Sequence, residues 1–201
     1  MWRGQWGEIK VVPNDSLLAA LQRYAVIPEE EWLYFLSQIS WKSIQKGQYV
    51  LHSGQSCEQI YYCEHGLFRM FYENEDGTEH IKSFVTEEQF FTDYRSFLTN
   101  TPSFLSIQAL EGSRYALFSK QTVEQLYERH ICWERFGRRL AESLFIRKSK
   151  KERELVELSA EERYRLFLQQ HSGLESRIPQ YQIAAFLAIS PVSLSRIRNK
   201  Q

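Results

Sequence analysis

The sequence predicts an α+β protein in which a β-rich barrel or sandwich precedes a long helix and a small all-helical unit. Three observations support this class: short β-rich runs separated by turn signals before residue 119, helical patterns after it, and an uneven distribution of charge. With 201 residues, of which 43% are hydrophobic and 14% aromatic, the chain can form one large domain or two small ones with real cores.

The β-rich half divides into short runs that end at turn signals. Asp76-Gly77 lies between two of these runs, and Gly54 and Gly66 follow two others. Aromatic or β-branched segments bounded by Gly, Asp and Asn are typical of hairpin strands. We therefore expect six strands that form a sandwich or a barrel, over residues 48–52, 59–63, 67–72, 78–84, 104–110 and 114–119.

Two helices are expected ahead of these strands, over residues 15–24 and 28–39. In the second, Pro28 stands at the first helical position, which proline favours. Four apolar residues of this helix recur at helical spacing and predict its buried face: Trp32, Phe35, Leu36 and Ile39.

After Ser119 the pattern is helical, with a short helix over residues 121–130 and a long one over residues 132–158. The long helix has about seven turns, more than one core needs to seat it. We therefore expect its middle to pair with a second copy of the chain, which predicts a homodimer. The apolar stripe expected to form this contact consists of Phe136, Leu140 and Leu144.

A further helix begins at Ser159, which forms a capping-box pattern with Glu162, and it ends near Gly173. These signals divide the chain into three parts. We expect an effector or sensor barrel over residues 1–120, linker and dimerisation helices over residues 121–158, and a helix-turn-helix over residues 159–201.

Charge is divided unevenly along the chain although the net charge is zero. Residues 1–134 contain 11 Lys and Arg against 18 Asp and Glu, a balance of −7. Residues 135–201 contain 14 against 7, a balance of +7. A basic half beside an acidic one indicates that the basic half contacts phosphates.

The segment 178–200 has the pattern of two short helices joined by a tight turn. Leu194 and Ile197 are spaced to pack the second helix on the first. Small polar side chains allow close approach to the major groove, and an outward arginine can bond guanine O6 and N7. We therefore predict a DNA-binding transcription regulator, not an enzyme, whose outward residues are Ser190, Pro191, Val192, Ser193, Ser195, Arg196 and Asn199.

This segment, IPQYQIAAFLAISPVSLSRIRNK, resembles the helix-turn-helix of the Crp/Fnr family of bacterial transcription regulators. Upstream, KGQYVLHSGQSCEQIYYCEHGLFRMFY resembles that family's cyclic-nucleotide-binding-type barrel, and SAEERYRLFLQQH resembles its helix before the DNA-binding domain. The resemblance covers roughly residue 15 to the end. It implies a double-stranded β-helix (jelly-roll) barrel, a homodimer joined through the long helix, and Arg196 as the base-reading arginine.

The sequence departs from family members that bind cyclic AMP. Those members hold the ribose with a Gly-Glu pair and the cyclic phosphate with Arg-Ser, where this chain has Thr92-Asp93 and Pro102-Ser103. A buried phosphate needs a charge-assisted partner, which proline cannot supply. We expect cyclic AMP not to bind and leave the small-molecule effector open. The candidate effector pocket consists of Thr92, Asp93, Arg95 and Ser103.

Three departures affect the DNA-binding end. The sequence stops at Gln201, so we expect a helix-turn-helix that lacks a wing. Ala188 replaces the glycine of the inter-helix turn, where a positive φ is often needed. Pro191 and Val192 replace polar or charged readers, so the DNA target should be unusual. The alternative is a ligand-binding or protein-interaction module of the same fold that has lost strong DNA binding.

Cysteine and histidine patterns favour no metal site or cofactor. Three scattered cysteines do not suit a disulfide framework, a zinc site or a four-cysteine cluster, so we expect reduced core thiols. No HxH pair suggests a metal-dependent cupin enzyme. A haem ligand is the remaining option for the isolated histidines. The residues concerned are Cys57, Cys63, Cys132, His52, His65 and His80.

Two further expectations concern an aromatic-rich stretch of the sequence and the cellular location of the protein. The aromatic residues form either the core or the lining of an apolar pocket, and the sequence leaves both open: Phe84, Phe90, Phe91, Tyr94, Phe97 and Phe104. No apolar run approaches the roughly 20 residues of a membrane span, and the N-terminus lacks the apolar region of a secretory signal. We therefore expect a cytoplasmic protein.

Overall fold

The computed structural model describes residues 15–199, so the predictions for the N-terminal residues 1–14 and for Lys200 lie outside the described residues. In chain order the elements are α1 (Asp15–Gln22), α2 (Glu29–Gln38), β1 (Ser40–Ile44), β2 (Tyr49–Leu51), β3 (Gln59–His65), β4 (Phe68–Glu73), β5 (Glu79–Val85), β6 (Gln89–Phe91), α3 (Tyr94–Thr99), β7 (Ser106–Ala109), β8 (Ser113–Ser119), α4 (Lys120–Arg129), α5 (Ile131–Glu157), α6 (Ala160–Gln170), the short 3-10 turn η1 (Leu174–Ser176), α7 (Gln180–Phe186) and α8 (Pro191–Arg198).

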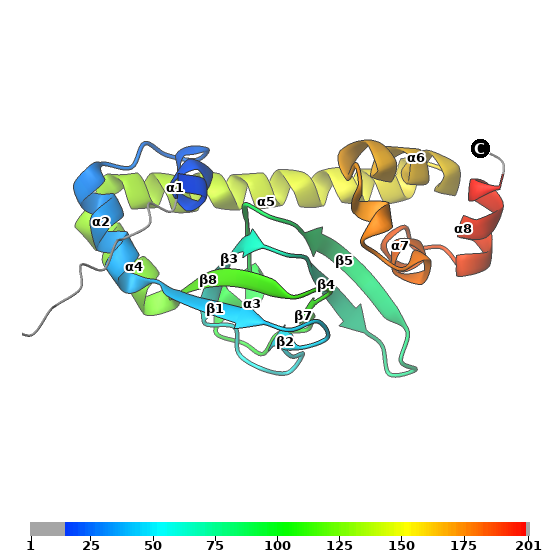
Figure 1. The fold of residues 1–201 in the computed structure, drawn as a ribbon, viewed down its shortest axis with the longest axis horizontal. Helices are drawn as coiled ribbons and strands as arrows, with labels where there is room; N and C mark the ends of the chain where they lie inside the picture. The colour runs from blue at the N-terminus through cyan, green and yellow to red at the C-terminus, as the bar shows by residue number, and fades with distance from the viewer. Residues whose placement is uncertain (1–14, 200–201) are drawn as a thin grey trace, which may run out of the picture.

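The strands form two four-stranded antiparallel sheets, in the orders β1–β8–β3–β6 and β2–β7–β4–β5 (Figure 1). The mixed helix-and-strand class and all six expected strands are confirmed. Within residues 15–199 no named strand pairs across the two sheets, so the expected closed barrel is instead a pair of open sheets. Sequence reasoning missed β1, whose side chains are mostly exposed, and β6, which has only three residues.

Side chains from both sheets fill the space between them. The ring of Phe91 lies 5.2 Å from that of Tyr61 and 4.9 Å from that of Phe68, measured between centroids. All three cysteines are free and buried, as expected for core thiols. Burial raises the pKa of Cys63 to about 12 and that of Cys132 to about 11, so both thiols stay protonated near neutral pH.

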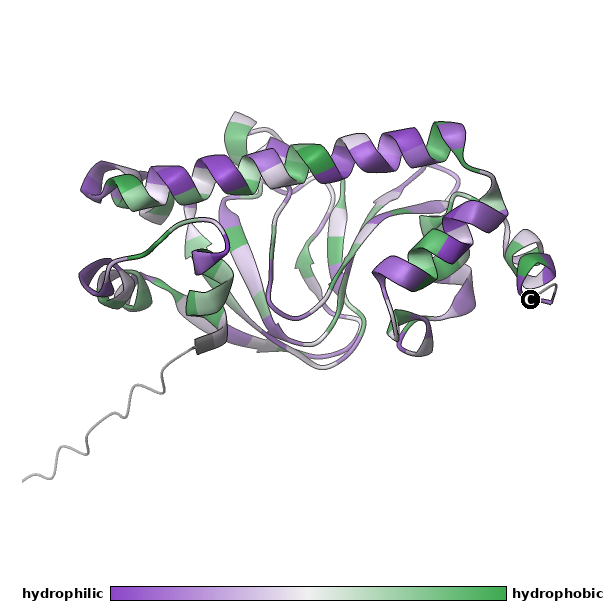
Figure 2. Cartoon of the chain, turned by 90° about the horizontal axis from the view of Figure 1, so that it is seen from above, coloured by the Kyte–Doolittle hydropathy of each residue, from purple (hydrophilic) through white to green (hydrophobic). Residues whose placement is uncertain are grey.

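The long helix α5 runs along one side of the molecule, from α2 and α4 to the C-terminal helices (Figures 1 and 2). Its first half packs in a hydrophobic cluster with Phe35 of α2 and with Trp133 of its own first turns. Phe136 and Leu140 are buried in this cluster, and Leu144 packs against it. The stripe that we expected to contact a second copy is therefore the seat of α5 on its own chain. The sequence shows an apolar helix face, but only tertiary structure shows that α1, α2 and α4 cover it.

The helices after α5 share a hydrophobic core with the sheet β2–β7–β4–β5. The rings of Phe84 on β5 and Phe186 on α7 lie 5.4 Å apart. Phe71 and Ile81 belong to the same cluster as Phe167 of α6. The C-terminal helical unit is therefore packed on the strands and is not held by α5 alone.

Local sequence signals set the helix ends. The Ser159 hydroxyl accepts a hydrogen bond from the Glu162 N–H, and the Glu162 carboxylate accepts one from the Ser159 N–H, so the predicted capping box is confirmed. Gly173 has a φ of +81° where α6 gives way to η1. Pro28 is the N-cap of α2 and not its first helical residue, a shift of one position from our prediction.

Candidate nucleic-acid interface and effector site

The helix α8 buries one side and exposes the other. Leu194 is 1% exposed, and Ile197 packs against the same hydrophobic cluster. Arg196 lies two residues after Leu194, about 200° around the helix, so the two side chains leave α8 on opposite sides. Of the residues expected to face outward, Ser193 is half-buried and the others are exposed: Ser190, Pro191, Val192, Ser195, Arg196 and Asn199.

Ala188 shapes the turn that joins α7 to α8. It has a φ of +54°, the left-handed conformation that the sequence predicted for this position. The Ile189 N–H donates to the Ala184 carbonyl at 3.0 Å, and the Ala188 N–H donates to the Ala185 carbonyl at 3.4 Å. This bonding pattern is a Schellman motif, which normally has glycine at the left-handed residue. The turn thus ends α7 tightly while retaining a strained alanine.

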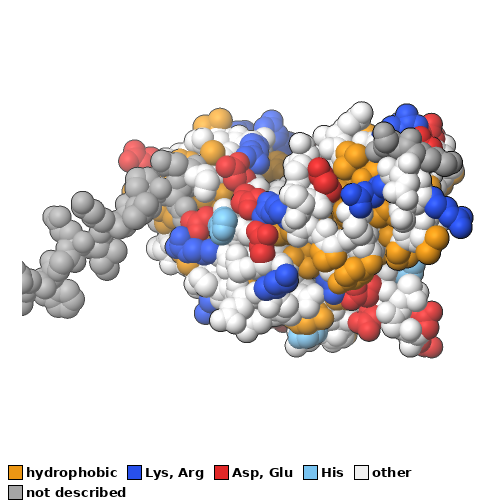
Figure 3. All heavy atoms as spheres, turned by 45° about the vertical axis from the view of Figure 1, so that its right-hand side comes forward, with side chains coloured by type: hydrophobic (Ala, Val, Ile, Leu, Met, Phe, Trp, Pro, Cys, Tyr) orange, Lys and Arg blue, Asp and Glu red, His pale blue; other side chains and the backbone are white. Residues whose placement is uncertain are grey.

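Serine and arginine side chains hold the two helices in place around this turn. The Ser190 hydroxyl accepts from the Ser193 N–H at 3.1 Å and caps α8. Arg163 of α6 donates to the carbonyls of Leu187, at 3.2 Å, and Leu158, at 2.6 Å. Arg163 is therefore structural, whereas among residues 15–199 the guanidinium of Arg196 makes no hydrogen bond or ion pair. Figure 3 turns this end of the molecule forward and shows Lys and Arg side chains along its outer edge.

Arg177 joins the C-terminal helices to the strands by charge. Its guanidinium forms ion pairs with Glu87, in the turn before β6, and with Glu111, in the turn before β8. It also donates to the Gly66 carbonyl at 3.2 Å. These bonds hold the pKa of Arg177 above its usual range. For Glu87, burial alone would raise the pKa, but the bonds from Arg177 and from backbone N–H groups outweigh burial and lower it.

Lys151 of α5 forms a second polar contact at the same junction. Its ammonium donates to the Lys82 carbonyl at 2.7 Å and lies 3.7 Å from the ring centroid of Phe186. Burial lowers the pKa of Lys151 to about 8, with Glu154 opposing this shift and Lys82 adding to it. The helix that carries the predicted dimer contact therefore touches both the strands and α7.

Two of the four candidate effector-pocket residues bond to each other. The Ser103 hydroxyl donates to the Asp93 carboxylate at 2.7 Å, and both residues are buried. Thr92, the residue before Asp93, is also buried, but its hydroxyl donates to the Gln59 carbonyl and contacts the Cys57 sulfur. These polar groups bond to one another and to a backbone carbonyl, and Pro102, the residue before Ser103, has no side-chain donor for a phosphate.

Arg95, the fourth candidate, bonds to the loop after α3 and not to Asp93. Its guanidinium donates to the Thr101 hydroxyl at 2.7 Å and to the Pro102 carbonyl, and it lies 3.8 Å from the ring centroid of the exposed Phe104. The residues that the sequence grouped into one pocket therefore divide into a buried Asp93–Ser103 pair and a surface arginine.

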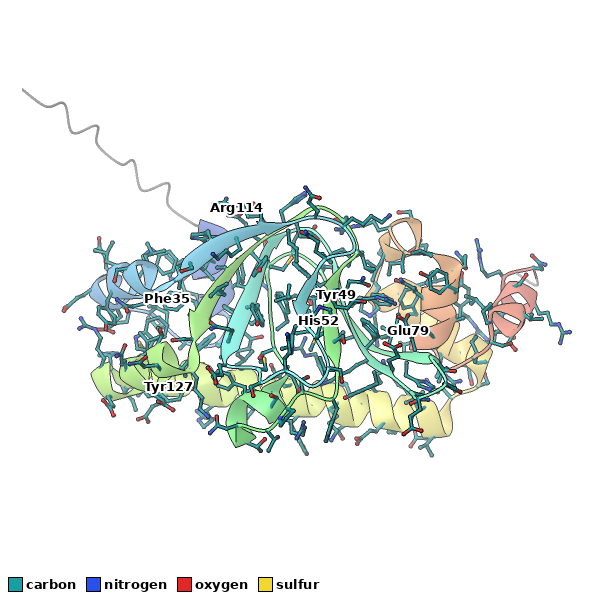
Figure 4. All side chains as sticks on the ribbon, turned by 90° about the horizontal axis from the view of Figure 1, so that it is seen from below. Phe35, Tyr49, His52, Glu79, Arg114 and Tyr127 are labelled. Atoms are coloured by element: carbon teal, nitrogen blue, oxygen red, sulfur yellow. The ribbon has the colours of Figure 1, made fainter. Side chains whose placement is uncertain are left out.

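The histidines and the aromatic-rich stretch have separate surroundings. His52 stacks on Tyr49 with ring centroids 4.1 Å apart (Figure 4), and His80 Nε2 lies 3.2 Å from Asn74 Nδ2. No group of three or more His, Cys, Asp or Glu within the described part of the chain has the arrangement of a metal site. None of the described helices is long and apolar enough to cross a membrane. Phe84, Phe90, Phe91 and Phe97 are buried, whereas Phe104 is exposed.

One region of the chain matches a known protein family. The family of the cyclic nucleotide-binding domain matches residues 41–130, which include β2–β8, α3 and α4. No curated protein matches the chain. The family match thus covers the two sheets and stops before α5.

Several solved structures have a similar fold. FixK2 from Bradyrhizobium japonicum matches at 17% sequence identity with a TM-score of 0.71, over 81% of this chain and 83% of that one. The c-di-GMP-responsive global regulator CLP from Xanthomonas campestris matches at 16% identity with a TM-score of 0.70, over 86% and 91%. A putative transcriptional regulator of the Crp/Fnr family from Eubacterium rectale matches at 12% identity with a TM-score of 0.69, over 87% and 83%. Residues 41–130 are therefore similar to the cyclic nucleotide-binding domain family, and the chain has a fold similar to that of these three solved structures.

Proposed function

We propose that this chain is a DNA-binding transcription regulator of the Crp/Fnr type that acts in the cytoplasm as a homodimer. The observation that carries this proposal is the division of α8 into a buried side at Leu194 and an exposed side at Arg196. On a fold similar to that of regulators, this arrangement presents a recognition helix to the major groove.

The exposed side of α8 suits DNA in its chemistry. Ser195 and Asn199 are short hydrogen-bonding side chains, and Arg196 can form a bidentate contact with guanine. Val192, which is 61% exposed, suits the methyl group of thymine and not a base nitrogen or oxygen. A target that contains both a guanine and a thymine in each half-site is the expected result.

The dimer contact that we propose uses the exposed side of α5. Phe145 is 71% exposed and Ile146 is 53% exposed, in contrast to the buried Phe136 and Leu140. Val156, which is 86% exposed, lies eleven residues after Phe145 and so leaves α5 on nearly the same side, with the polar Ser149 and Glu152 between them. Phe145 and Val156 are the apolar contacts that we expect between the two helices.

The effector in this proposal is not cyclic AMP. The Asp93 carboxylate is buried and accepts a hydrogen bond from Ser103, the residue that stands where members that bind cyclic AMP hold the phosphate. The residue before Ser103 is Pro102, whose side chain has no donor for a phosphate, and Arg95 is engaged with the Thr101–Pro102 loop.

The test is selection of binding duplexes from a random pool, followed by gel shifts at about 50 and 200 mM salt. A DNA-binding protein retards duplexes more strongly at low salt because phosphate contacts release counterions. Arg196→Ala should lose preference at one base position, at a cost of roughly 1–3 kcal/mol. Arg198→Ala removes the same charge two residues away on α8 and is the matched control, which should keep the sequence preference.

The same experiment also tests an alternative function. If the wild-type protein retards no duplex at low salt, the proposal is wrong and the chain is a ligand-binding or protein-interaction module of this fold. The apolar, exposed Val192 is the observation that favours this second candidate.

A further inference from the structure

An apolar cavity of about 220 Å³ lies where α3, α4 and α5 meet β8 and α2. Tyr94 and Phe97 of α3 form one wall, and Trp133 of α5 belongs to another. The cavity therefore decides an alternative that the sequence left open: part of the aromatic-rich stretch lines a pocket. Figure 4 labels Phe35 of α2 and Tyr127 of α4, which mark the end of the molecule where the cavity lies.

The mouth of the cavity is marked by its two most exposed hydrophobic lining residues. Leu98 is 55% exposed and Tyr127 is 36% exposed, whereas Phe97, Phe118 and Trp133 are buried. A small molecule that enters between Leu98 and Tyr127 therefore meets an aromatic interior. Pockets that bind small ligands combine such apolar walls with few polar groups.

Gly137 lets Tyr127 lie against α5 at this mouth. A Cβ at position 137 would stand 2.0 Å from the Tyr127 hydroxyl oxygen, so any larger residue would displace the tyrosine. Glycine within a helix is unfavourable and needs a local reason. Burial raises the pKa of Tyr127, so its hydroxyl stays protonated and can donate one hydrogen bond to a ligand.

The charged groups of the lining do not suit an anionic ligand. The Lys120 ammonium already donates to the Phe97 carbonyl and to Asn100 Oδ1, both at 2.9 Å. The other charged residue of the lining, Glu124, is an acid that repels anions. In size, the cavity exceeds an apolar cavity of about 150 Å³ that is known to hold benzene. An uncharged molecule of one or two aromatic rings fits these limits.

We propose that this cavity binds an uncharged aromatic molecule of one or two rings, which serves as the effector of the protein. The ligand touches α3, which directly follows the Thr92–Asp93 position, and α5, whose far half contacts α7 through Lys151. Binding thus changes the packing of the helix that reaches the C-terminal helices. The effector role rests on the proposed DNA-binding function, whereas ligand binding does not.

Calorimetric titration of the full chain with indole, decanoate and cyclic AMP tests the binding step. We expect saturable binding of indole with one site per chain and none of the two anions. Binding of decanoate or cyclic AMP in place of indole would overturn the ligand class, and no binding of indole would overturn the site.

Variants at the mouth separate this cavity from other apolar surfaces. Leu98→Trp fills the entrance and Leu98→Glu charges it, and each should weaken indole binding at least tenfold. Because Leu98 is more than half exposed, neither change should prevent folding. Leu33→Glu alters an equally exposed leucine, 57% accessible on α2, that does not line the cavity, and it should leave indole affinity unchanged.

Two further measurements test whether a second copy of the chain covers the cavity and whether the bound molecule acts as an effector. If indole binds only after dilution has dissociated a dimer, a second copy covers the cavity and the proposal is wrong. In gel shifts with the selected duplex, indole should change DNA affinity at least threefold for the wild type and not for Leu98→Trp. Indole binding with unchanged DNA affinity would refute the effector role, whereas failure to retard DNA with or without indole would refute the proposed function instead.

Discussion

Arg177 Nη2 lies 2.8 Å from Glu87 Oε1, which connects the segment before α7 to the turn between β5 and β6. Glu111, between β7 and β8, bonds the same guanidinium. The C-terminal helices are thus attached to the two sheets by an ion-pair network in addition to the hydrophobic cluster around Phe84 and Phe186. Any change in how α7 and α8 sit on the strands must break or move this network.

Replacement of Arg177 should loosen this junction. We expect Arg177→Gln to lower the free energy of unfolding by about 1 kcal/mol, because the network is only partly buried and solvent weakens its charges. Arg165→Gln removes an exposed ion pair with Glu161 and should change stability by less than about 0.5 kcal/mol. Chemical denaturation measures both. Equal effects of the two variants would show that Arg177 does not join the helices to the strands.

The lowered pKa of Glu87 gives this junction a pH dependence. A glutamate in the unfolded chain titrates near 4.3, so the stability that its ionised form contributes is present above that pH. It is lost as the pH falls through the lower, folded-state value. The difference in unfolding free energy between wild type and Glu87→Gln should therefore shrink below about pH 4; a constant difference from pH 7 to pH 3 would contradict this.

Lys151 should make stability rise at alkaline pH. Its pKa is about 8 in the folded protein, mainly because of burial, and near 10.4 in an unfolded chain. The unfolded state binds more protons between these values, so unfolding becomes less favourable as the pH increases. Wild type should gain about 1 kcal/mol over Lys151→Met between pH 8 and pH 9.5. Lys148→Met, at an exposed position on the same helix, is the control and should show no such trend.

Ala188 is a site where glycine should stabilise the protein. A left-handed φ costs a non-glycine residue about 1–2 kcal/mol in the folded state. Glycine removes this strain, but its more flexible unfolded chain offsets part of the gain. We expect Ala188→Gly to raise the free energy of unfolding by about 0.5–1 kcal/mol. Ala185→Gly, within α7, should lower it by about 1 kcal/mol. Thermal unfolding compares the two variants, and destabilisation by Ala188→Gly would refute the assigned strain.

The exposed side of α5 should control association. Phe145→Glu places a charge in the proposed helix seam, so we expect a monomer in sedimentation velocity where the wild type is a dimer. Leu33→Glu changes an exposed leucine of α2 and should leave the dimer intact. A monomeric wild type, or a dimeric Phe145→Glu protein, would exclude this contact.

Local signals in the sequence were sufficient for the elements whose cause is local. The capping box at Ser159, the turn at Gly173 and the cap at Ser190 involve neighbours three residues apart, so the pattern contains the interaction itself. The left-handed turn at Ala188 had no local signal, because alanine does not favour a positive φ; the expectation came from the resemblance to a family with glycine at this position. By contrast, β1 lacks a clear apolar alternation and is stabilised by its pairing with β8.

The sequence likewise predicted only those features of the candidate site that depend on nearby residues. Helical spacing alone indicated that Leu194 is buried and Arg196 exposed, because both lie on one short helix. Contacts between distant segments followed from no sequence pattern: Arg177 with Glu87, and Phe136 with Tyr24 and Phe90.

The sequence by itself determined the type of most elements, with β1, β6 and α3 as exceptions, and it also determined the outward face of α8, since these features depend on residues within a few positions of one another. Tertiary structure alone decided which side of α5 stays available, where Arg95 points, and that Tyr94, Phe97 and Tyr127 surround a cavity. The physical reason is that burial and cavity shape depend on which surfaces the folded chain brings together, and periodicity within one segment does not specify its partner.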